Sequence, residues 1–138
     1  MEIEILSTFV FGFVRRERRE RLLYEIDAPK KRDKFFDRFA HDTQRFFNRD
    51  MIVLQGNRLK SNQILKMIYE NGKIPDKFVL IVDNQAYESE NGKELLERAF
   101  DNLGQSVLLC DHFAFIKEET EYGAPEKILL KNSKFLVR

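Results

Sequence analysis

Five basic side chains recur along residues 29–48 at spacings that place them on one side of a helix. At about 100° per residue they lie within about 80° of one another and extend over roughly 20 Å of helix axis. Positive groups over this length can contact several phosphates of a nucleic acid or the carboxylates of an acidic protein. The pattern predicts an anion-binding surface, and a solvated helix face is the alternative. The five residues are Lys31, Lys34, Arg38, His41 and Arg45.

A second group of basic residues precedes this helix. Residues 15–21 contain five arginines, of which Arg15, Arg18 and Arg19 are assigned to the predicted binding surface. Residues 15–49 together hold 12 Lys and Arg against 7 Asp and Glu. Acidic residues four positions away along the helix can neutralise part of this positive charge through ion pairs. A self-neutralised helix surface is therefore the alternative interpretation.

Two carboxylates and a histidine form the other candidate site. Asp83 and Asp111 each follow an apolar run that is typical of a buried strand, and His112 comes next. If the two strands are parallel, their carboxyl ends share the edge where open α/β sheets bind ligands. The carboxylates could then hold Mg²⁺, with His112 as a base or a further ligand. Because Asp is also a common turn former, two ordinary turns are the alternative.

The chain has few other parts for catalysis. It contains two histidines and one cysteine, and it lacks a Gly-rich phosphate loop, a GxSxG motif and an HExxH motif. A single cysteine excludes an internal disulfide and CxxC metal or redox motifs. We therefore expect no cofactor, and a binding protein is favoured over an enzyme.

Three helices are predicted in the first half of the chain. Residues 8–26 are rich in strong helix formers, although residues 2–14 also alternate in the manner of a strand. Residues 29–48 have a phenylalanine face opposite the basic stripe, and residues 61–72 run from a capping serine to a closing glycine. The face predicted to enter the core is formed by Phe35, Phe36, Phe39, Ala40, Phe46 and Phe47.

The second half of the chain favours strands. A helix over residues 93–104 is expected to join two of them as a right-handed βαβ unit of about residues 78–110. The acidic segment 83–92 is interpreted as a flexible loop with either a binding role or none. The strands are predicted at residues 51–55, 78–82, 106–110, 113–117 and 127–131.

These elements predict one α+β domain over residues 1–138. We expect an N-terminal helical hairpin and a third helix packed on a mixed sheet of four to five strands, with a C-terminal β-hairpin. The longest apolar run near the start is far short of the ~20 residues of a membrane span, and no secretory signal is recognisable. A cytoplasmic protein without membrane contact is the expectation.

The leading hypothesis is a non-enzymatic cytosolic domain that binds through the basic face of residues 15–45. Its partner would be an acidic protein or a small anionic ligand. Nucleic acid is less favoured, because a net charge of +1 is far from the basic footprint of a DNA-binding domain. One alternative is a small metal-dependent hydrolase or nuclease that uses Asp83 and Asp111. Another is a docking or neutralising subunit for one cognate protein, in which segment 83–92 matters more.

Overall fold

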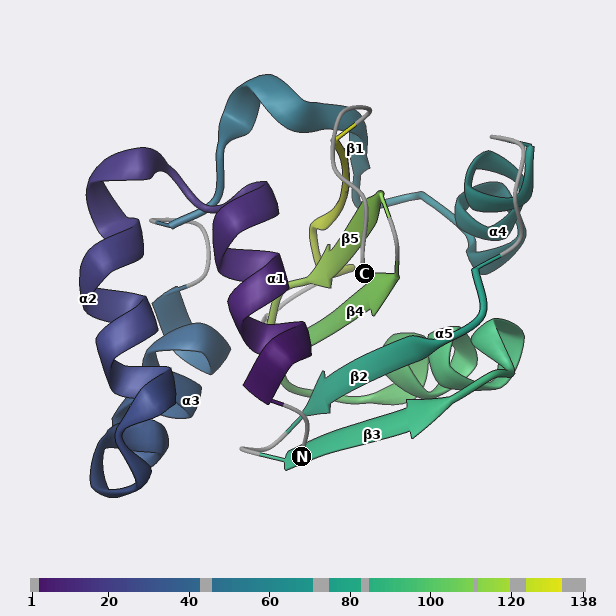
Figure 1. Cartoon of the computed structure of the whole chain (residues 1–138). Helices are drawn as coiled ribbons and strands as arrows, with labels where there is room; N and C mark the ends of the chain where they lie inside the picture. Colours follow the sequence, from purple (N-terminus) through teal and green to yellow (C-terminus); the bar gives the residue numbers. More distant parts are fainter. Residues whose placement is uncertain are drawn as a thin grey trace.

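The structure is a computed structural model in which helices cover both faces of one sheet (Figure 1). Within the described ranges, the side chains of residues 3–5, 8 and 39–42 are left outside the description. None of the described helices is long and apolar enough to cross a membrane. The described residues are 3–42, 46–70, 75–82, 85–110, 112–119 and 124–132.

Helices make up most of the first half of the chain, and strands most of the second half. The helical elements are α1 (Ile3–Phe13), α2 (Arg16–Asp27), the 3₁₀ turn η1 (Pro29–Lys31), α3 (Arg32–Asp42), the 3₁₀ turn η3 (Arg49–Met51), α4 (Ser61–Tyr69) and α5 (Gly92–Asp101). The strands are β1 (Ile52–Gly56), β2 (Phe78–Val82), β3 (Gln85–Ser89), β4 (Ser106–Cys110), β5 (Phe113–Lys117) and β6 (Lys127–Lys131).

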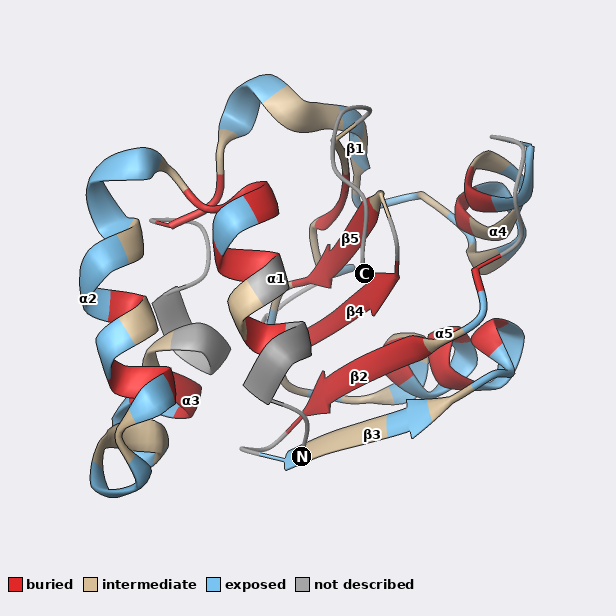
Figure 2. Cartoon of the chain, in the orientation of Figure 1, coloured by how far each residue is buried: buried red, intermediate tan, exposed pale blue. Residues whose placement is uncertain are grey.

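The sheet has six strands in the order β1-β6-β5-β4-β2-β3, and every neighbouring pair is antiparallel. Helices α1, α2 and α3 lie on one side of it, and α4 and α5 on the other (Figure 1). The central strands β2, β4 and β5 are buried along their whole length (Figure 2). A strand covered on both faces needs apolar residues at every position, which explains runs such as FVLIV.

Alternation along the strands divides the interior into two cores. In β2, Val79 and Ile81 face the N-terminal helices, whereas Phe78 and Leu80 face α4 and α5. The first core is filled largely by phenylalanines of the helical half, including Phe35, which is closed to solvent. The helical half is therefore anchored to the sheet through aromatic packing.

The α+β class and most of the predicted elements are confirmed. Strands β2, β4, β5 and β6 have the predicted bounds, β1 begins one residue later, and β4, β5 and β6 form consecutive antiparallel pairs. The predicted third helix ends at Tyr69 rather than at Gly72, which is outside the described residues. Lys60, rather than Ser61, is its N-cap residue, and the Lys60 N–H donates to Gln63 Oε1 at 2.8 Å.

The predicted βαβ unit is wrong, because β2 and β4 are antiparallel neighbours. The predicted flexible acidic loop contains β3, which pairs with β2 from Phe78↔Ser89 to Val82↔Gln85. Helix α5 then leads from β3 to β4 on the other side of β2. The result is a sheet of six antiparallel strands instead of a mixed sheet of four or five.

The predicted helix over residues 8–26 is two helices. The chain breaks at Val14, which forms a β-bridge with Phe47. On either side of this bridge the Arg15 N–H donates to the Phe46 carbonyl and the Asn48 N–H donates to the Phe13 carbonyl, each at 2.7 Å. Because these groups bond across the chain, they are lost to a continuous helix. The same contact separates Phe46 and Phe47 from α3, which ends at Asp42.

Candidate functional site

A buried carboxylate in α2 is the starting point for the site. Leu22, Glu25 and Ile26 are three and four residues apart, so that they share one face of the helix. All three are buried, with Glu25 only 3% exposed. The two apolar residues drive this face into the core, and the helical repeat carries the glutamate in with them.

Two arginines contact one oxygen of this carboxylate. Arg38 Nη1 of α3 lies 2.9 Å from Glu25 Oε1, and Arg21 Nε of α2 lies 3.4 Å from the same atom. The other oxygen, Oε2, is buried and has no hydrogen-bond partner in the described part of the chain. A buried acceptor of this kind is unusual, because leaving it unpaired costs about 1–3 kcal/mol.

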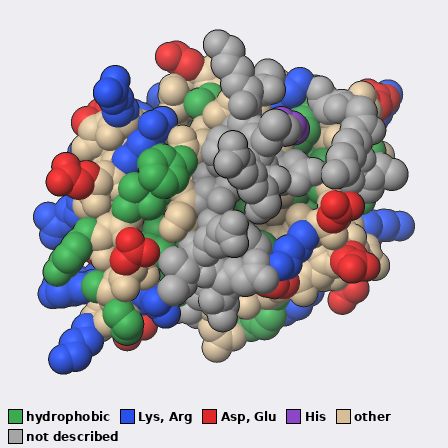
Figure 3. All heavy atoms as spheres, in the orientation of Figure 1, with side chains coloured by type: hydrophobic (Ala, Val, Ile, Leu, Met, Phe, Trp, Pro, Cys, Tyr) green, Lys and Arg blue, Asp and Glu red, His purple; other side chains and the backbone are tan. Residues whose placement is uncertain are grey.

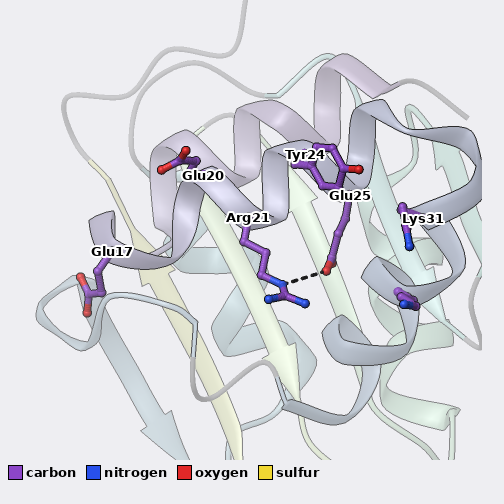
Figure 4. A pocket seen from close by; sticks show the side chains of 7 residues that line it. Glu17, Glu20, Arg21, Tyr24, Glu25 and Lys31 are labelled. Carbon is purple, nitrogen blue, oxygen red and sulfur yellow. Dashed lines mark hydrogen bonds and ion pairs between the residues drawn. The ribbon is translucent and has the colours of Figure 1, made fainter.

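The Glu25 carboxylate borders an open pocket between α2 and the start of α3 (Figure 4). The pocket has a volume of about 570 Å³, which lies within the size range of small-ligand sites. Tyr24 is 62% exposed and contributes an aromatic surface to the lining. We call this hollow the α2–α3 pocket; its lining residues are Glu17, Glu20, Arg21, Tyr24, Glu25, Lys31 and Lys34.

Three residues of the predicted basic stripe are placed at or beside this pocket. Lys31 and Lys34 line it, and Arg38 is bound to Glu25. The stripe was expected to face away from the core, but Arg38 follows the buried Phe35 by three residues and is only about 60° from it around the helix. It therefore turns toward α2, and its side chain is 31% exposed.

The predicted arginines at the start of α2 lie outside the pocket lining. Arg18 is exposed, whereas Arg19 is half-buried and its Nε donates to the Val14 carbonyl at 3.0 Å. Arg15 Nε lies 3.9 Å from Glu17 Oε1. The side chains of the two remaining predicted residues, His41 and Arg45, are outside the described part of the chain.

The parallel strands on which the predicted metal site was based are absent from the described sheet. Asp83 and Asp111 are outside the described residues, but the strands that precede them do not run in parallel. Val82 pairs with Ser106 at the beginning of β4, so the carboxyl ends of β2 and β4 are separated by the length of β4, about 14 Å. The premise that both ends share one edge of the sheet is wrong.

The third predicted ligand, His112, is engaged with the main chain. Its Nδ1 lies 2.9 Å from the carbonyl oxygen of Asn132. Across the described ranges, no group of three or more His, Cys, Asp or Glu residues could hold a metal ion. The metal-dependent alternative thus stays a prediction without structural support.

The acidic segment 83–92 also differs from the flexible loop that the sequence predicts. Glu88 of β3 pairs with Lys77, whose Nζ lies 3.1 Å from its Oε2. The Arg98 guanidinium of α5 covers the Tyr87 ring at 4.4 Å from its centroid. These contacts hold the segment as the edge of the sheet.

A second group of buried charges lies at one end of β5 and β6. Lys117 is 2% exposed, and its Nζ donates to the backbone carbonyls of Asn102 and Gly104, the latter at 2.9 Å. Lys127 is its cross-strand neighbour and donates to the Asn57 carbonyl at 2.8 Å. Burial, followed by the charge of Lys127, lowers the pKa of Lys117. Because both amines hold main-chain carbonyls, we assign them a structural role.

Sequence reasoning did not single out the acidic wall of the α2–α3 pocket. Glu17, Glu20 and Tyr24 are three and four residues apart and therefore lie on one side of α2. This spacing was a usable signal, but it was interpreted only as charge neutralisation within the helix. That the same side faces Lys31 depends on how α2 and α3 pack.

In the α2–α3 pocket, a buried, incompletely paired carboxylate, exposed charges and a hollow coincide. The chemistry it offers is charge recognition, since acidic and basic side chains of α2, η1 and α3 line it together. Comparison of the chain with models of known protein families, with curated proteins and with solved structures gave no match.

Proposed function

We propose that this protein is a small binding domain that engages the carboxylates of an acidic protein segment through Lys31 and Lys34. The observation that carries the proposal is the state of the cations around the α2–α3 pocket. Arg21 and Arg38 are held by Glu25, whereas Lys31 and Lys34 have no ion pair within the described residues. Their ammonium groups are therefore available to a partner.

The surroundings of Lys31 and Lys34 favour a role in binding a partner over that of ordinary solvent-exposed lysines. The Arg38–Glu25 pair ties α3 to α2 at the base of the pocket, which fixes the positions from which the lysines reach into it. A preorganised site binds more tightly because less side-chain and loop freedom is lost on association. Complementary charge additionally speeds the encounter and makes it sensitive to salt.

A protein segment fits this surface better than a nucleic acid. The Lys and Arg side chains over α2 stand among Asp and Glu side chains and do not form a continuous basic area (Figure 3). Glu17 and Glu20 line the same pocket and would repel successive phosphates of a backbone. A protein segment, in contrast, can place an acidic side chain beside the lysines and an uncharged or basic one beside the glutamates.

The test is a titration of the protein with a fluorescein-labelled peptide that carries two adjacent glutamates at one end of a Gly-Ser segment, followed by anisotropy at low and at high salt. We expect saturable binding that weakens as salt rises, because the Debye length shortens from about 30 Å at 0.01 M to about 10 Å at 0.1 M. The double variant Lys31→Glu/Lys34→Glu should bind at least about tenfold more weakly, since two attractive contacts become repulsive.

The matched control is Lys66→Glu/Lys93→Glu, which makes the same change in net charge on α4 and α5, across the sheet. It should bind the peptide nearly as the parent protein does. Equal weakening in both variants would mean that only net charge matters, and the proposal would be wrong. Tighter binding of a labelled duplex DNA than of the peptide would also overturn it.

A further inference from the structure

The α2–α3 pocket is divided by charge along its length. Glu17 and Glu20 stand at one end and Lys31 at the other, with the Arg21–Glu25 pair between them (Figure 4). Lys34 follows Lys31 by three residues and also lines the pocket. The hollow thus has an acidic end on the first turns of α2 and a basic end at the start of α3.

The two ends are far enough apart to act separately. Along α2, Glu17 and Glu20 lie about 12 Å and about 8 Å of helix axis before Glu25, and Lys31 lies beyond Glu25 (Figure 4). These separations equal or exceed the Debye length of about 8 Å at physiological ionic strength, so that each end attracts its own charged group with limited interference from the other. A ligand with one sign of charge would be held at one end and repelled at the other.

The acidic end remains accessible to a partner. The Glu17 side chain is 67% exposed, and its contact with Arg15 is long at 3.9 Å. Exposed pairs at this distance contribute little and are readily exchanged for another cation. Glu20 is exposed and has no ion pair within the described residues.

Glu25 is a second and independent sign that the pocket is incomplete. Its side chain is 4% exposed, and Oε2 lacks a donor in the described part of the chain. The Arg21 side chain, which is 71% exposed, contacts Glu25 only at 3.4 Å. The buried polar groups of the pocket are therefore not fully satisfied within the described residues.

We propose that the partner segment is bipolar: a short stretch of protein with basic side chains at one end and acidic side chains at the other. Its basic end meets Glu17 and Glu20, and its acidic end meets Lys31 and Lys34. The exposed ring of Tyr24 offers the middle of the segment an apolar contact. This assignment rests on the proposed function of the pocket and adds the charge order of the partner.

The experiment compares short labelled peptides with blocked ends and the same binding assay. One bipolar peptide has two lysines, a Gly-Ser-Gly spacer and two glutamates, and a second has the reverse order, so that both chain directions are tested. The controls are a peptide of the same composition with alternating charges and the acid-only peptide of the same length. The better bipolar peptide should bind about tenfold more tightly than either control, because only it matches both ends.

Charge reversal at each end then separates this proposal from the one on which it rests. Glu17→Lys/Glu20→Lys should remove the preference for the bipolar peptide and strengthen binding of the acid-only peptide. Lys31→Glu/Lys34→Glu should weaken both. Circular dichroism and the thermal midpoint verify that each variant is folded.

The outcomes are distinguishable. If the acid-only peptide binds as tightly as the bipolar ones and the glutamate variant changes nothing, the bipolar assignment is wrong while the proposed function stands. If the lysine variant leaves every peptide unaffected, or if no peptide binds, the proposed function fails and the charge order fails with it.

Discussion

Glu25 and Lys117 are both nearly closed to water, but the groups around them differ in kind. Glu25 is contacted by two arginine side chains and borders an open pocket, and one of its oxygens has no donor in the described residues. Lys117 is contacted by two main-chain carbonyls at the end of α5. Burial of a charge alone therefore does not indicate a binding site. The groups that contact the charge and the access of solvent to it distinguish a binding site from a structural contact.

The helix dipoles sharpen the contrast. Lys117 Nζ reaches the carbonyls that follow α5, where a positive charge is favourable. Glu25 lies in the last turn of α2, where a negative charge is unfavourable and where α2 has no basic residue of its own. The charge of Lys117 is thus favoured by the dipole of α5, whereas the charge of Glu25 is disfavoured by the dipole of α2 and depends on Arg38 for stabilisation. Local conflicts of this kind are expected at functional sites more than in purely structural contacts.

If Lys117 is purely structural, its removal should have the largest effect on stability. Lys117→Ala leaves the carbonyls of Asn102 and Gly104 unpaired and opens a cavity, and we expect a loss of about 4 kcal/mol in the free energy of unfolding. Urea denaturation measures it. Lys117→Met keeps most of the volume and removes the repulsion from Lys127, so it should lose clearly less. An Ala variant as stable as the parent would refute the structural assignment.

Breaking the Arg38–Glu25 pair should have the next largest effect. Arg38→Met leaves the buried Glu25 with only the long contact to Arg21, and we expect a loss of about 2 kcal/mol, moderated by the partial exposure of Arg38. Removing both partners in Glu25→Gln/Arg38→Met should cost less than the sum of the single changes. A double-mutant cycle in urea measures this coupling, and additive losses would show that the pair does not hold α3 to α2.

The lowered pKa of Lys117 predicts how stability responds to alkaline pH. Between the lowered folded pKa and the ordinary value of 10.5, the unfolded chain binds more protons than the folded chain. The contribution of Lys117 to stability therefore increases as pH rises through this window. Urea midpoints measured across it should show this increase in the parent and not in Lys117→Met. If the urea midpoint depended on pH in the same way in both proteins, the titrating group would not be Lys117.

Glu118 should act with the opposite sign in acid. Burial and, secondarily, the charge of Glu126 raise the pKa of Glu118, with Arg49 opposing them. Above its ordinary pKa of 4.5 the folded chain holds this proton longer than the unfolded chain, so the contribution of Glu118 falls as pH rises toward the raised value. Glu118→Gln should remove this part of the acid dependence of the urea midpoint, and an unchanged profile would contradict it.

The elements that could be predicted are those whose pattern is complete within a few consecutive residues. Strands β2, β4, β5 and β6 each contain a run of three to five consecutive apolar residues, so their bounds could be predicted from the sequence alone. β3 could not, because it is an edge strand in which only Ala86, Tyr87 and Ser89 are half-buried. The break at Val14 depends on Phe47, which is distant in the sequence.

The candidate site divides in the same way. The Arg21–Glu25 contact was predictable from four-residue spacing and is present at 3.4 Å. The Arg38–Glu25 pair joins two helices, and no spacing rule predicts which residues of separate helices meet. Lys31 and Lys34 were found because they share a helix side with Arg38, but their position opposite Glu17 needed the packed structure.

Reversal of the two pocket lysines should have the smallest effect on stability and the largest effect on binding. Neither Lys31 nor Lys34 has an ion pair among the described residues, so Lys31→Glu/Lys34→Glu should change the free energy of unfolding by no more than about 0.5 kcal/mol. Glu25→Gln should have the larger effect on stability, because it weakens the pair that holds α3 to α2. It should have the smaller effect on binding, because both lysines stay in place and only their preorganisation is reduced. Urea midpoints and peptide anisotropy measured on both variants check this crossing. If the lysine variant lost stability and binding in proportion, its lost binding would reflect a disordered pocket, and Lys31 and Lys34 would be structural in the same sense as Lys117.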